Sequence, residues 1–385
     1  MTPFLYTYVS CVTFLSLDDF ACPVLTFFAR AHNINTGYFR NVKMKVAIYR
    51  GKGQIVLEEV DIPEVASECV IVDNMVTGVC GSDLHEYFGQ WDQPRFASGH
   101  ELTGVVTEVG DDVSRFEPSD RVCVECFSHC GSCRFCKNGL YNLCDSRVFM
   151  ANRGHSGFSE YSLLHESSLS KLPKDMSFEK GALIEPLAVA CRAFYSTGAD
   201  QNDSIAILGG GAIGLLTMGA AKTLGVKEAF ISVKYGHQTL VAEKMGADHV
   251  VQISDQNIKE EIDSVTKGYG VDIVIDTVGS AQAFQEAIEI SRKRGKICLV
   301  GGYYGSQNVD LAPIVWKELQ LIGSNCYGYS GMHRDFELAA DLLAHEKIDT
   351  SLLVTHRFGL DEIVLALETA ADKSTGSIKV QIQQL

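Results

Sequence analysis

The chain has 385 residues, long enough for two domains with substantial cores. Lysine and arginine total 33 against 48 aspartates and glutamates, and the resulting net charge of −15 excludes the basic surface that nucleic-acid binding needs. Thirteen cysteines without a secretory pattern indicate reduced thiols and metal ligands in a cytoplasmic protein.

Residues 1–43 fit none of the patterns found later in the chain. The stretch is aromatic, apolar and sparsely charged; no basic segment precedes it, and Asp18 and Asp19 interrupt it. A signal peptide and a membrane span are therefore both disfavoured, and we expect no membrane partner. The favoured explanation is an upstream start codon chosen in error, with Met44 as the native start. An extension of unknown role that packs on the surface is the second explanation.

Two neighbouring segments carry residues of the types that bind a catalytic metal ion. GVCGSDLHEY contains Cys80, and SGHELTGVV contains His100 and Glu101. A catalytic zinc ion needs few protein ligands and an open position for substrate, and one cysteine, one histidine and one carboxylate from scattered segments meet that need. Taken alone, the same residues are also explained by a buried cysteine and a histidine that caps a turn.

Four cysteines follow in one short run, CGSCRFCKNGLYNLC. Cys130, Cys133, Cys136 and Cys144 have the spacing C-x2-C-x2-C-x7-C. Four thiolates at about 2.3 Å hold a tetrahedral zinc ion, and loops this short can wrap one ion without help from distant sequence. A pair of disulfides is the rival, but two-residue spacings close strained loops poorly. The spacing therefore predicts a structural zinc lobe over residues 130–144.

The remaining cysteines are assigned to packing. Cys123 and Cys126 precede the lobe in DRVCVEC, whose alternation predicts a strand, and they stay open as rival metal ligands. Cys326, like three other cysteines spread along the chain, is interpreted as an ordinary buried thiol.

A glycine-rich turn marks the start of a second type of architecture. SIAILGGGAIG begins with an apolar strand at 205–208 and continues as G-x-G-x-x-G into a predicted helix at 215–224. The glycines permit a tight turn and close backbone approach, and the helix N-terminus then receives a pyrophosphate. The predicted cofactor contacts in this turn are Gly209, Gly211, Ala212, Ile213 and Gly214.

Strands and helices alternate beyond this turn. Apolar runs recur at 229–233, 248–252, 271–276, 296–300 and 319–323, with helical patterns around 238–246, 257–267 and 280–291. This alternation predicts the α/β fold class with a doubly wound parallel sheet. Thr277 and Val278, directly after the third run, and Gly301, directly after the fourth, are further predicted cofactor contacts.

The end of the second strand of this sheet bears on the choice of cofactor. Folds specific for NAD place an acidic residue there to bind the ribose hydroxyls. Here the run ends at Val233 and is followed by Lys234, Tyr235 and His237, with no carboxylate nearby. A 2′-phosphate would find a cation and a stacking ring in these residues, although an exposed lysine on a loop is common. NADP(H) is therefore favoured over NAD(H).

Together these segments resemble the zinc-dependent medium-chain alcohol and polyol dehydrogenase family, from about Met44 to the C-terminus. The Cys80 segment, GHE at 99–101, the cysteine lobe, residues 157–161 and EPLAVA at 185–190 appear in the family's order. The Glu-Pro-Leu run is similar to the sorbitol and threonine dehydrogenase branch, which places a carboxylate near the catalytic metal. The resemblance implies a GroES-like, mainly-β catalytic domain beside a Rossmann domain.

The resemblance also implies roles for individual residues. The candidates for the catalytic metal are Cys80, His100, Glu101 and Glu185. The two glutamates would bind directly, through water or in exchange with each other, while Glu185 is also explained as an acid at a helix N-terminus. The catalytic candidates are Ser82, His85 and Glu101.

Ser82 lies like the family's relay hydroxyl and His85 like its terminal base, so the proton would pass from Ser82 through the nicotinamide ribose to His85. Ser82 and Asp83 are also typical caps of a helix that begins there. For Asp83 the preferred role is to orient His100 by a hydrogen bond.

The function implied is hydride transfer between a secondary alcohol or polyol, or its ketone, and NAD(P), with one catalytic and one structural zinc ion. Sorbitol itself is disfavoured, since the family's polyol-contacting arginine falls at Cys326 and its early tyrosine at Glu86. A zinc-stabilised nucleotide-binding protein without dehydrogenase activity is one alternative. A quinone-reductase-like member of the superfamily is another, but it would lack Cys80 and the cysteine lobe.

The motifs also predict how the chain is divided. Residues 44–188 and 328–385 should form the catalytic domain, and residues 189–327 the nucleotide-binding domain. A helical stretch near 333–346 would lead the chain back to the catalytic domain. The partner is a small-molecule substrate, and the resemblance implies a homo-oligomer, either a dimer or a tetramer.

Overall fold

A seven-stranded and a six-stranded sheet organise the chain in the computed structural model, which describes residues 43–89, 94–150 and 156–384. The predictions made for residues 1–42 lie outside this part. The described segments from Lys43 onward form one compact unit. The boundaries predicted at 188/189 and 327/328 therefore stay predictions.

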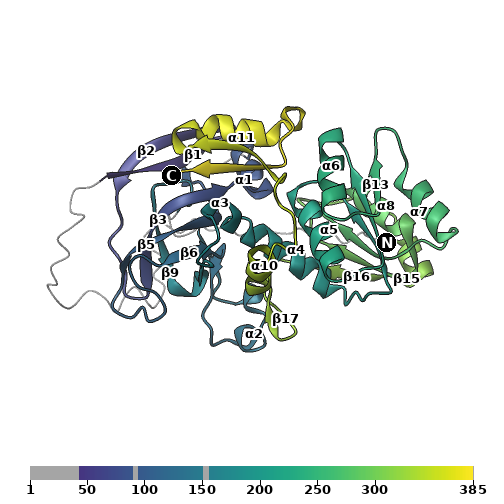
Figure 1. The fold of residues 1–385 in the computed structure, drawn as a ribbon, viewed down its shortest axis with the longest axis horizontal. Helices are drawn as coiled ribbons and strands as arrows, with labels where there is room; N and C mark the ends of the chain where they lie inside the picture. The colour runs from purple at the N-terminus through teal and green to yellow at the C-terminus, as the bar shows by residue number, and fades with distance from the viewer. Residues whose placement is uncertain (1–42, 90–93, 151–155, 385) are drawn as a thin grey trace, which may run out of the picture. The chain divides into compact units, whose positions relative to one another are not determined.

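The seven-stranded sheet joins the two ends of the described chain. Its strands run in the order β10-β6-β5-β3-β20-β19, and β9 also pairs with β3. Their bounds are β3 Cys69–Gly78, β5 Glu101–Val109, β6 Arg121–Val124, β9 Tyr161–His165, β10 Leu169–Lys171, β19 Val354–Gly359 and β20 Lys379–Gln383. Figure 1 shows the yellow C-terminal strands beside the purple and blue N-terminal ones, and β20 pairs antiparallel with β3. This pairing brings late residues of the sequence next to early ones.

Shorter elements surround this sheet. The strands are β1 Lys43–Gly51, β2 Gln54–Asp61 and β4 Arg95–Phe96 in one small sheet, β7 Phe127–Ser128 with β8 Val148–Phe149, and β17 Tyr329–Ser330 with β18 His333–Arg334. The helices are α1 Gly81–Tyr87, α2 Arg134–Lys137, α3 Phe178–Gly181 and α11 Ile363–Ala371. The core between β1, β20 and α11 contains Tyr49, Phe158 and Leu367, which are fully buried.

The six-stranded sheet is parallel throughout and has the order β13-β12-β11-β14-β15-β16. Its strands are β11 Ser204–Leu208, β12 Glu228–Val233, β13 His249–Gln252, β14 Val271–Asp276, β15 Ser291–Leu299 and β16 Gln320–Gly323. Every strand predicted by an apolar run is present. The predicted α/β class with a parallel sheet is therefore confirmed.

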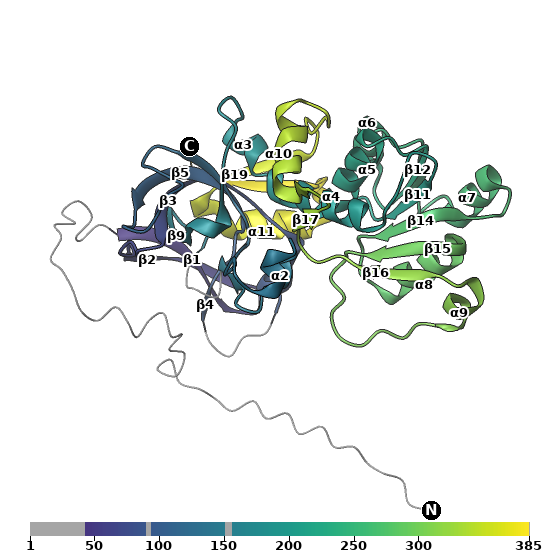
Figure 2. The same cartoon turned by 90° about the horizontal axis from the view of Figure 1, so that it is seen from below.

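Helices cover both faces of this sheet, as Figure 2 shows with α5 and α6 on one side and α8 and α9 on the other. The bounds are α4 Ile184–Ser196, α5 Ala212–Thr223, α6 Gly236–Lys244, α7 Ile258–Thr266, α8 Ala281–Ile290, α9 Ala312–Lys317 and α10 Asp335–Ala344. Side chains alternate along a strand, so Ile205 and Ile207 enter the core with α4 and α5. Ala206 and Leu208 enter the core with α7 and α8. The sheet is buried on both faces, as doubly wound sheets are.

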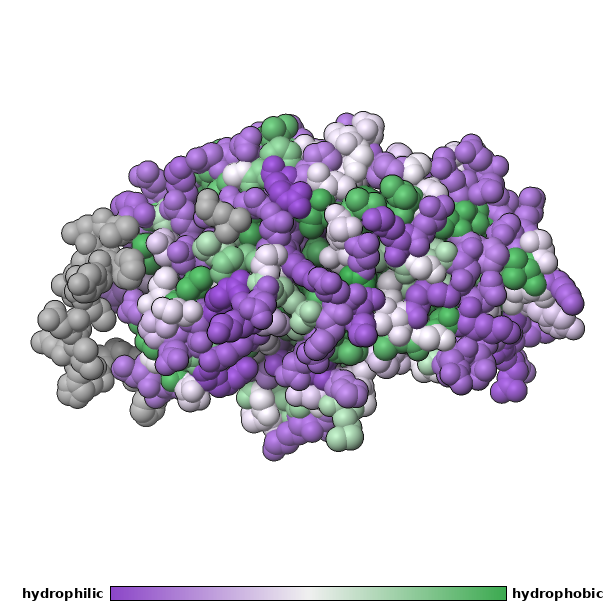
Figure 3. Space-filling view, viewed as in Figure 1, coloured by the Kyte–Doolittle hydropathy of each residue, from purple (hydrophilic) through white to green (hydrophobic). Residues whose placement is uncertain are grey.

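The described residues contain no helix that is both long and apolar enough to cross a lipid bilayer. Hydrophilic residues dominate the face drawn in Figure 3, with smaller apolar groups between them.

Candidate active site

Asp83 brings the two predicted metal-ligand segments together. Its side chain is fully buried, and its two carboxylate oxygens accept the backbone N–H of Cys80 at 2.8 Å and of Gly99 at 3.3 Å. Gly99 has a φ of +61°, which favours glycine, and this turn leads directly into the second segment. As a result, the ligand atoms of Cys80, His100 and Glu101 all lie within 4.8 Å of one another.

The imidazole of His100 is oriented by a serine that was not predicted. Its Nδ1 lies 3.1 Å from Ser98 Oγ and 4.0 Å from the nearer carboxylate oxygen of Asp83. The hydrogen-bond partner is therefore Ser98, while Asp83 holds the backbone on either side. A histidine engaged at Nδ1 offers Nε2 to a metal ion, so the arrangement suits a ligand role.

Glu101 has a buried cation as its partner. Both of its carboxylate oxygens accept hydrogen bonds from Lys379 Nζ, at 2.6 and 2.7 Å, and the ammonium also donates to the carbonyl of Val79 at 3.0 Å. The Lys379 side chain is 4% exposed and the Glu101 side chain is 1% exposed. Gly78 makes room for the carboxylate, because a Cβ there would come within 2.0 Å of it. Lys379 lies on β20 and was not predicted; a lysine in an otherwise buried strand was the available signal.

Glu185 lies at the start of α4 and is buried, with Pro186 directly after it. Burial raises the pKa of its carboxyl to about 7, against the opposing effect of His100. The hydroxyl of Tyr327 also acts to lower the pKa of this carboxyl. Glu185 is not part of the group of three ligand atoms within 4.8 Å, although it is close enough for His100 and Glu101 to act on its pKa.

The predicted proton-relay residues lie on α1, whose N-cap is Cys80. Ser82 is half-buried, and His85 is exposed. The His85 ring lies against the ring of Tyr304 with 4.3 Å between the centroids. Tyr304 follows β15 of the parallel sheet and was not predicted. This ring contact joins α1, which directly follows Cys80, to the loop after β15 of the parallel sheet.

The four lobe cysteines are arranged as a tetrahedral metal site requires. The Sγ–Sγ distances are 3.6 Å for Cys133–Cys136, 3.5 Å for Cys130–Cys144 and 4.0 Å for Cys130–Cys136. A zinc ion with thiolates at 2.3 Å would separate them by about 3.8 Å. All four sulfur atoms lie within 4.8 Å of one another, and all four cysteines are free thiols.

Backbone amides point at the sulfur atoms of this lobe. The N–H of Cys133 donates to Cys130 Sγ at 3.4 Å, and that of Cys136 donates to Cys133 Sγ at 3.5 Å. Cys144 Sγ accepts from the N–H of Cys130 at 3.5 Å and from that of Ser146 at 3.4 Å. Such contacts favour thiolates, which are the form that binds zinc.

The glycine-rich turn has the shape that dinucleotide binding requires. Gly209 has a φ of +105°, and a Cβ at Gly214 would lie 1.8 Å from the Gly209 carbonyl oxygen. Gly211 is the N-cap of α5, and Ala212 and Ile213 form its first turn. Nothing lies within 4 Å of a Cβ added at Gly211, so the approach to this helix N-terminus is open.

The other predicted cofactor contacts lie at the carboxyl ends of β14 and β15. Thr277 Oγ1 donates to the Leu208 carbonyl at 2.8 Å, which fixes the end of β14 to the glycine-rich turn. Val278 is exposed, and Gly301 lies against the backbone of Gly279. The strand order reverses between β11 and β14, and ligands of doubly wound sheets bind at such a switch point.

The loop after β12 presents a cation and stacked rings. Lys234 is exposed, with Nζ 5.5 Å from the centroid of the Tyr235 ring, and this ring stacks on His237 at 5.6 Å. Gln238 Oε1 accepts the backbone N–H of both Lys234 and Tyr235, which fixes the loop. Burial and the nearby Lys373 lower the pKa of His237. Lys373, which was not predicted, is a second cation whose charge acts on this loop.

Two family models match the chain: "Zinc-binding dehydrogenase" over residues 212–345 and "Alcohol dehydrogenase GroES-like domain" over residues 66–174. Sorbitol dehydrogenase of Bacillus subtilis (strain 168) is 33% identical over 349 residues, 88% of this chain and 97% of that protein. D-arabitol-phosphate dehydrogenase of Enterococcus avium is 32% identical over 339 residues, 86% of this chain and 95% of that protein.

A solved structure from Sinorhizobium meliloti 1021, bound to NADP, superposes with a TM-score of 0.80 at 28% identity. It covers 89% of this chain and 100% of its own. The similarity thus extends over most of this chain and over nearly the whole length of the matched proteins.

Proposed function

The chain belongs to the zinc-dependent medium-chain alcohol and polyol dehydrogenase family, and we propose that it transfers hydride between a secondary alcohol or polyol, or its ketone, and a nicotinamide cofactor. The observation that carries this is the buried Asp83, which draws Cys80 and the His100–Glu101 segment into one ligand group. A zinc-free reductase of the same fold has no need of that group.

We propose Cys80 and His100 as the protein ligands of the catalytic zinc ion, with the carboxylates of Glu101 and Glu185 nearby. The residues fit a zinc ion in type and spacing. A zinc ion bound there supplies Lewis acidity that favours the ionised form of a substrate hydroxyl. Lys379 holds Glu101 in place through hydrogen bonds to both carboxylate oxygens, and His100 and Lys379 both act to lower the pKa of the buried Glu185 carboxyl.

The proposed exit for the substrate proton is Ser82 and then His85. Ser82 follows Cys80 by two residues and has a hydroxyl that both donates and accepts. His85 is exposed, so a proton that reaches its ring can pass to solvent. The lobe at 130–144 has a separate proposed role, as a closed structural zinc site that holds its loop together.

We propose NADP(H) as the preferred cofactor. Zinc and a nicotinamide cofactor belong to the family, and the finer choice rests on the loop after β12. Lys234 is exposed there, the charge of Lys373 acts on His237, and residues 234–239 contain no acid. Two cations without an acid suit a ribose 2′-phosphate better than ribose hydroxyls.

The division into domains at 44–188 with 328–385 and at 189–327 is also proposed. The strands of the parallel sheet all lie between Ser204 and Gly323, which supports it. A cytoplasmic location is proposed because Cys80 and the four lobe cysteines are free thiols, as expected in a reducing compartment.

We propose that the chain forms homo-oligomers through the outer edge of the parallel sheet. β16 is the edge strand, and near it Val315 and Trp316 on α9 are 73% and 77% exposed. Leu311 and Leu321 are also exposed. Large apolar side chains beside an open strand edge are costly for a monomer. Trp316→Asp should lower the molecular mass measured by sedimentation, whereas Met332→Asp, an exposed change elsewhere, should not.

The function is tested by fluorescence titration with NADPH and NADH, followed by assays on a panel of secondary alcohols, polyols and ketoses. Activity is expected on at least one substrate, with NADPH bound at least about tenfold more tightly than NADH, a difference of about 1.4 kcal/mol. Cys80→Ala should abolish activity while nucleotide binding survives, and Cys69→Ala, a buried thiol on β3, should preserve both. Activity that persists in Cys80→Ala would contradict the proposed site.

A further inference from the structure

The loop after β15 carries two neighbouring tyrosines that contact different parts of the molecule. The Tyr303 hydroxyl donates a hydrogen bond to the carboxylate of Asp276, at the end of β14. The Tyr304 ring lies against the ring of His85 on α1, with 4.3 Å between the centroids and 43° between the planes. His85 therefore has an aromatic partner that comes from the parallel sheet and not from its own helix.

The loop is anchored at the end of the parallel sheet. The Asp276 side chain is fully buried, and its Oδ1 accepts the backbone N–H of Val278 at 2.8 Å and of Gly279 at 3.2 Å. The backbone carbonyl of Asp276 accepts the N–H of Gly301 at 3.0 Å. A Cβ at Gly301 would lie 2.3 Å from the Gly279 backbone nitrogen, so the two turns touch through their backbones. Tyr304 thus extends from a well-anchored support.

Gly302 makes room for the Tyr304 ring. A Cβ at Gly302 would lie 2.7 Å from Cε2 of Tyr304 and 3.2 Å from its Oη, so the ring lies directly over this glycine. Gln307 Nε2 donates to the Tyr304 carbonyl at 3.1 Å and holds the backbone after the ring. Tyr304 is nevertheless 58% exposed. Its contact with His85 is therefore made at the surface and is not part of a hydrophobic core.

His85 needs such a partner if it accepts a proton. Ser82 and His85 are three positions apart on α1, a spacing that places them on one face of the helix. His85 is exposed, and an exposed histidine is free to change rotamer. Proton transfer is efficient only when a ring nitrogen stays within hydrogen-bond reach of the donor. A ring held against Tyr304 has lost much of this freedom before substrate binds.

We propose that Tyr304 is a positioning residue for His85 in the dehydrogenase reaction. Its ring holds the imidazole in one orientation, beside the loop that carries the proposed cofactor contact Gly301. The proton given up by the substrate hydroxyl reaches a ring nitrogen of His85 by way of Ser82 and leaves that nitrogen for water. Tyr304 neither gives nor takes a proton, so its ring is required and its hydroxyl is not. The inference rests on the proposed function of His85.

The first test measures the rate of the first turnover of alcohol oxidation by stopped-flow absorbance, because release of the reduced cofactor does not enter this rate. Tyr304→Ala should lower the rate about tenfold, equivalent to about 1.4 kcal/mol, with little change in the substrate concentration that gives half the maximal rate. Tyr304→Phe keeps the ring and should retain the rate to within about twofold. An equal loss in both variants, or no loss in Tyr304→Ala, would overturn the proposal.

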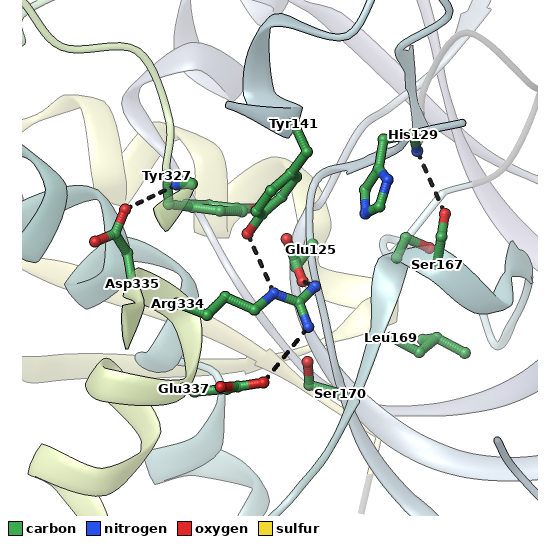
Figure 4. A network of polar contacts seen from close by, with 12 residues as sticks. Glu125, His129, Tyr141, Ser167, Leu169, Ser170, Tyr327, Arg334, Asp335 and Glu337 are labelled. Carbon is green, nitrogen blue, oxygen red and sulfur yellow. Dashed lines mark hydrogen bonds and ion pairs between the residues drawn. The ribbon is translucent and has the colours of Figure 1, made fainter. Parts of the chain in front are cut away.

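A double-mutant cycle separates positioning from an effect on the fold. His85→Ala removes the group that is positioned, so adding Tyr304→Ala to it should change the rate by less than about twofold. The control is Tyr141→Phe, which removes the hydroxyl that accepts from Arg334 Nε in the buried network of Figure 4. Any loss that Tyr141→Phe causes should be the same with and without His85. The same behaviour in Tyr304→Ala would mean that this tyrosine acts on the fold and would overturn the proposal.

A spectroscopic test of the ring contact does not depend on activity. In protein with isotope-labelled histidine rings, the magnetic resonance signal of His85 is identified by its absence in His85→Ala. This signal should move in Tyr304→Ala, which removes the ring current of the tyrosine, and stay in place in Tyr304→Phe. Tyr269→Ala, a change at a 79% exposed tyrosine between α7 and β14, should leave it unmoved. A signal that does not move in Tyr304→Ala would overturn the proposal.

The two proposals fail in different ways. A His85 signal that moves as expected, in a protein without dehydrogenase activity on any substrate, would refute the proposed function and with it the role of Tyr304. Dehydrogenase activity that depends on His85 and is unchanged in Tyr304→Ala would overturn the role of Tyr304 alone.

Discussion

At the scale of single residues, Lys379 decides how the carboxylate beside the metal ligands is held. An ionised group without water or a partner is costly in a protein interior. Glu101 avoids this cost because the ammonium of Lys379 binds both of its oxygens at 2.6 and 2.7 Å. The lysine is in turn fixed by the carbonyl of Val79, directly before Cys80. One side chain thus connects the end of the chain to both metal-ligand segments.

Lys379→Met should lower the free energy of unfolding by about 3–5 kcal/mol, because it leaves Glu101 buried without its partner. The measurement is urea unfolding followed by fluorescence. Lys45→Met removes an ammonium that pairs with Asp361 at 2.8 Å on the surface, and this control should change stability little. If Lys379→Met with Glu101→Gln is no more stable than Lys379→Met alone, the buried charge is not the cause.

The sequence showed which residues could bind metal but not what holds them. Cys80, His100 and the four lobe cysteines were found because their residue types and spacings are unusual. Ser98, Lys379 and Tyr327 were missed because serines, lysines and tyrosines are common and their partners lie far away in the sequence or depend on a turn. The hydrogen bond from Lys379 to Glu101 joins residues 278 positions apart. Such a pairing is visible only once β20 lies beside β3.

At the scale of elements, the turn between β11 and α5 allows a side chain at one glycine and excludes it at another. Gly214→Ala should destabilise the protein by about 1–3 kcal/mol, since its Cβ would lie 1.8 Å from the Gly209 carbonyl. Gly211→Ala meets nothing within 4 Å and should cost less than about 1 kcal/mol. Thermal unfolding without cofactor measures both. Equal losses for the two variants would contradict the geometry of the turn.

The first residues of β11 and β14 are joined by Asp272, and this contact depends on pH. Partial burial raises the pKa of Asp272, but hydrogen bonds from Ser204 and Arg292 outweigh burial and lower it below 3.8. The stabilisation is therefore complete above pH 3.8 and is lost as the pH falls through the lower value of the folded state.

Asp272→Asn removes this pH-dependent contribution. The unmutated chain should be more stable than the variant at about pH 6, and the difference should shrink toward about pH 3. Urea unfolding at both pH values measures it, with the exposed Asp111→Asn as the control. A difference that grows on acidification would mean that Asp272 is not stabilised as a carboxylate.

The elements of the parallel sheet were easier to predict than those of the other sheet. Continuous apolar runs identified β12 to β16 to within a few residues, because strands buried on both faces carry apolar side chains throughout. β15 begins at Ser291, five residues before the predicted run at 296–300. Its first residues, Ser-Arg-Lys-Arg-Gly, are not apolar, so an apolar run could not reveal them, although Ser291 already pairs with Val271. The short antiparallel strands, such as β7 and β8, have too few residues for a clear alternation.

At the scale of the whole molecule, the two proposed zinc sites should be separable. The unmutated chain is expected to contain two zinc ions per chain by mass spectrometry of the metal. Cys80→Ala should lose one zinc ion together with activity. Its unfolding temperature should stay close to that of the unmutated chain, because the lobe keeps its own zinc ion. Cys133→Ser should lose the other and lower the unfolding temperature, because the lobe has few buried side chains of its own to hold it.

The same comparison can contradict the assignment. Retention of both zinc ions in Cys133→Ser would mean that Cys130, Cys136 and Cys144 bind zinc without it or that the ion is elsewhere. The fold itself was predictable as a whole, since the order of motifs indicated the GroES-like and Rossmann architectures now matched by both family models. The boundaries between these parts were less accessible, because α4 contacts β15 of the parallel sheet and also packs against α10.

Strand β20 has a consequence for how the protein is made. It leaves the ribosome after every other strand described here, yet it lies between β3 and β19 and carries the ammonium that Glu101 needs. The parallel sheet, complete by Gly323, can form while translation continues, but the sheet around Cys80 waits for residues 379–383. A product released before Lys379 would thus keep its nucleotide-binding sheet and leave an unfinished half for cellular proteases to recognise.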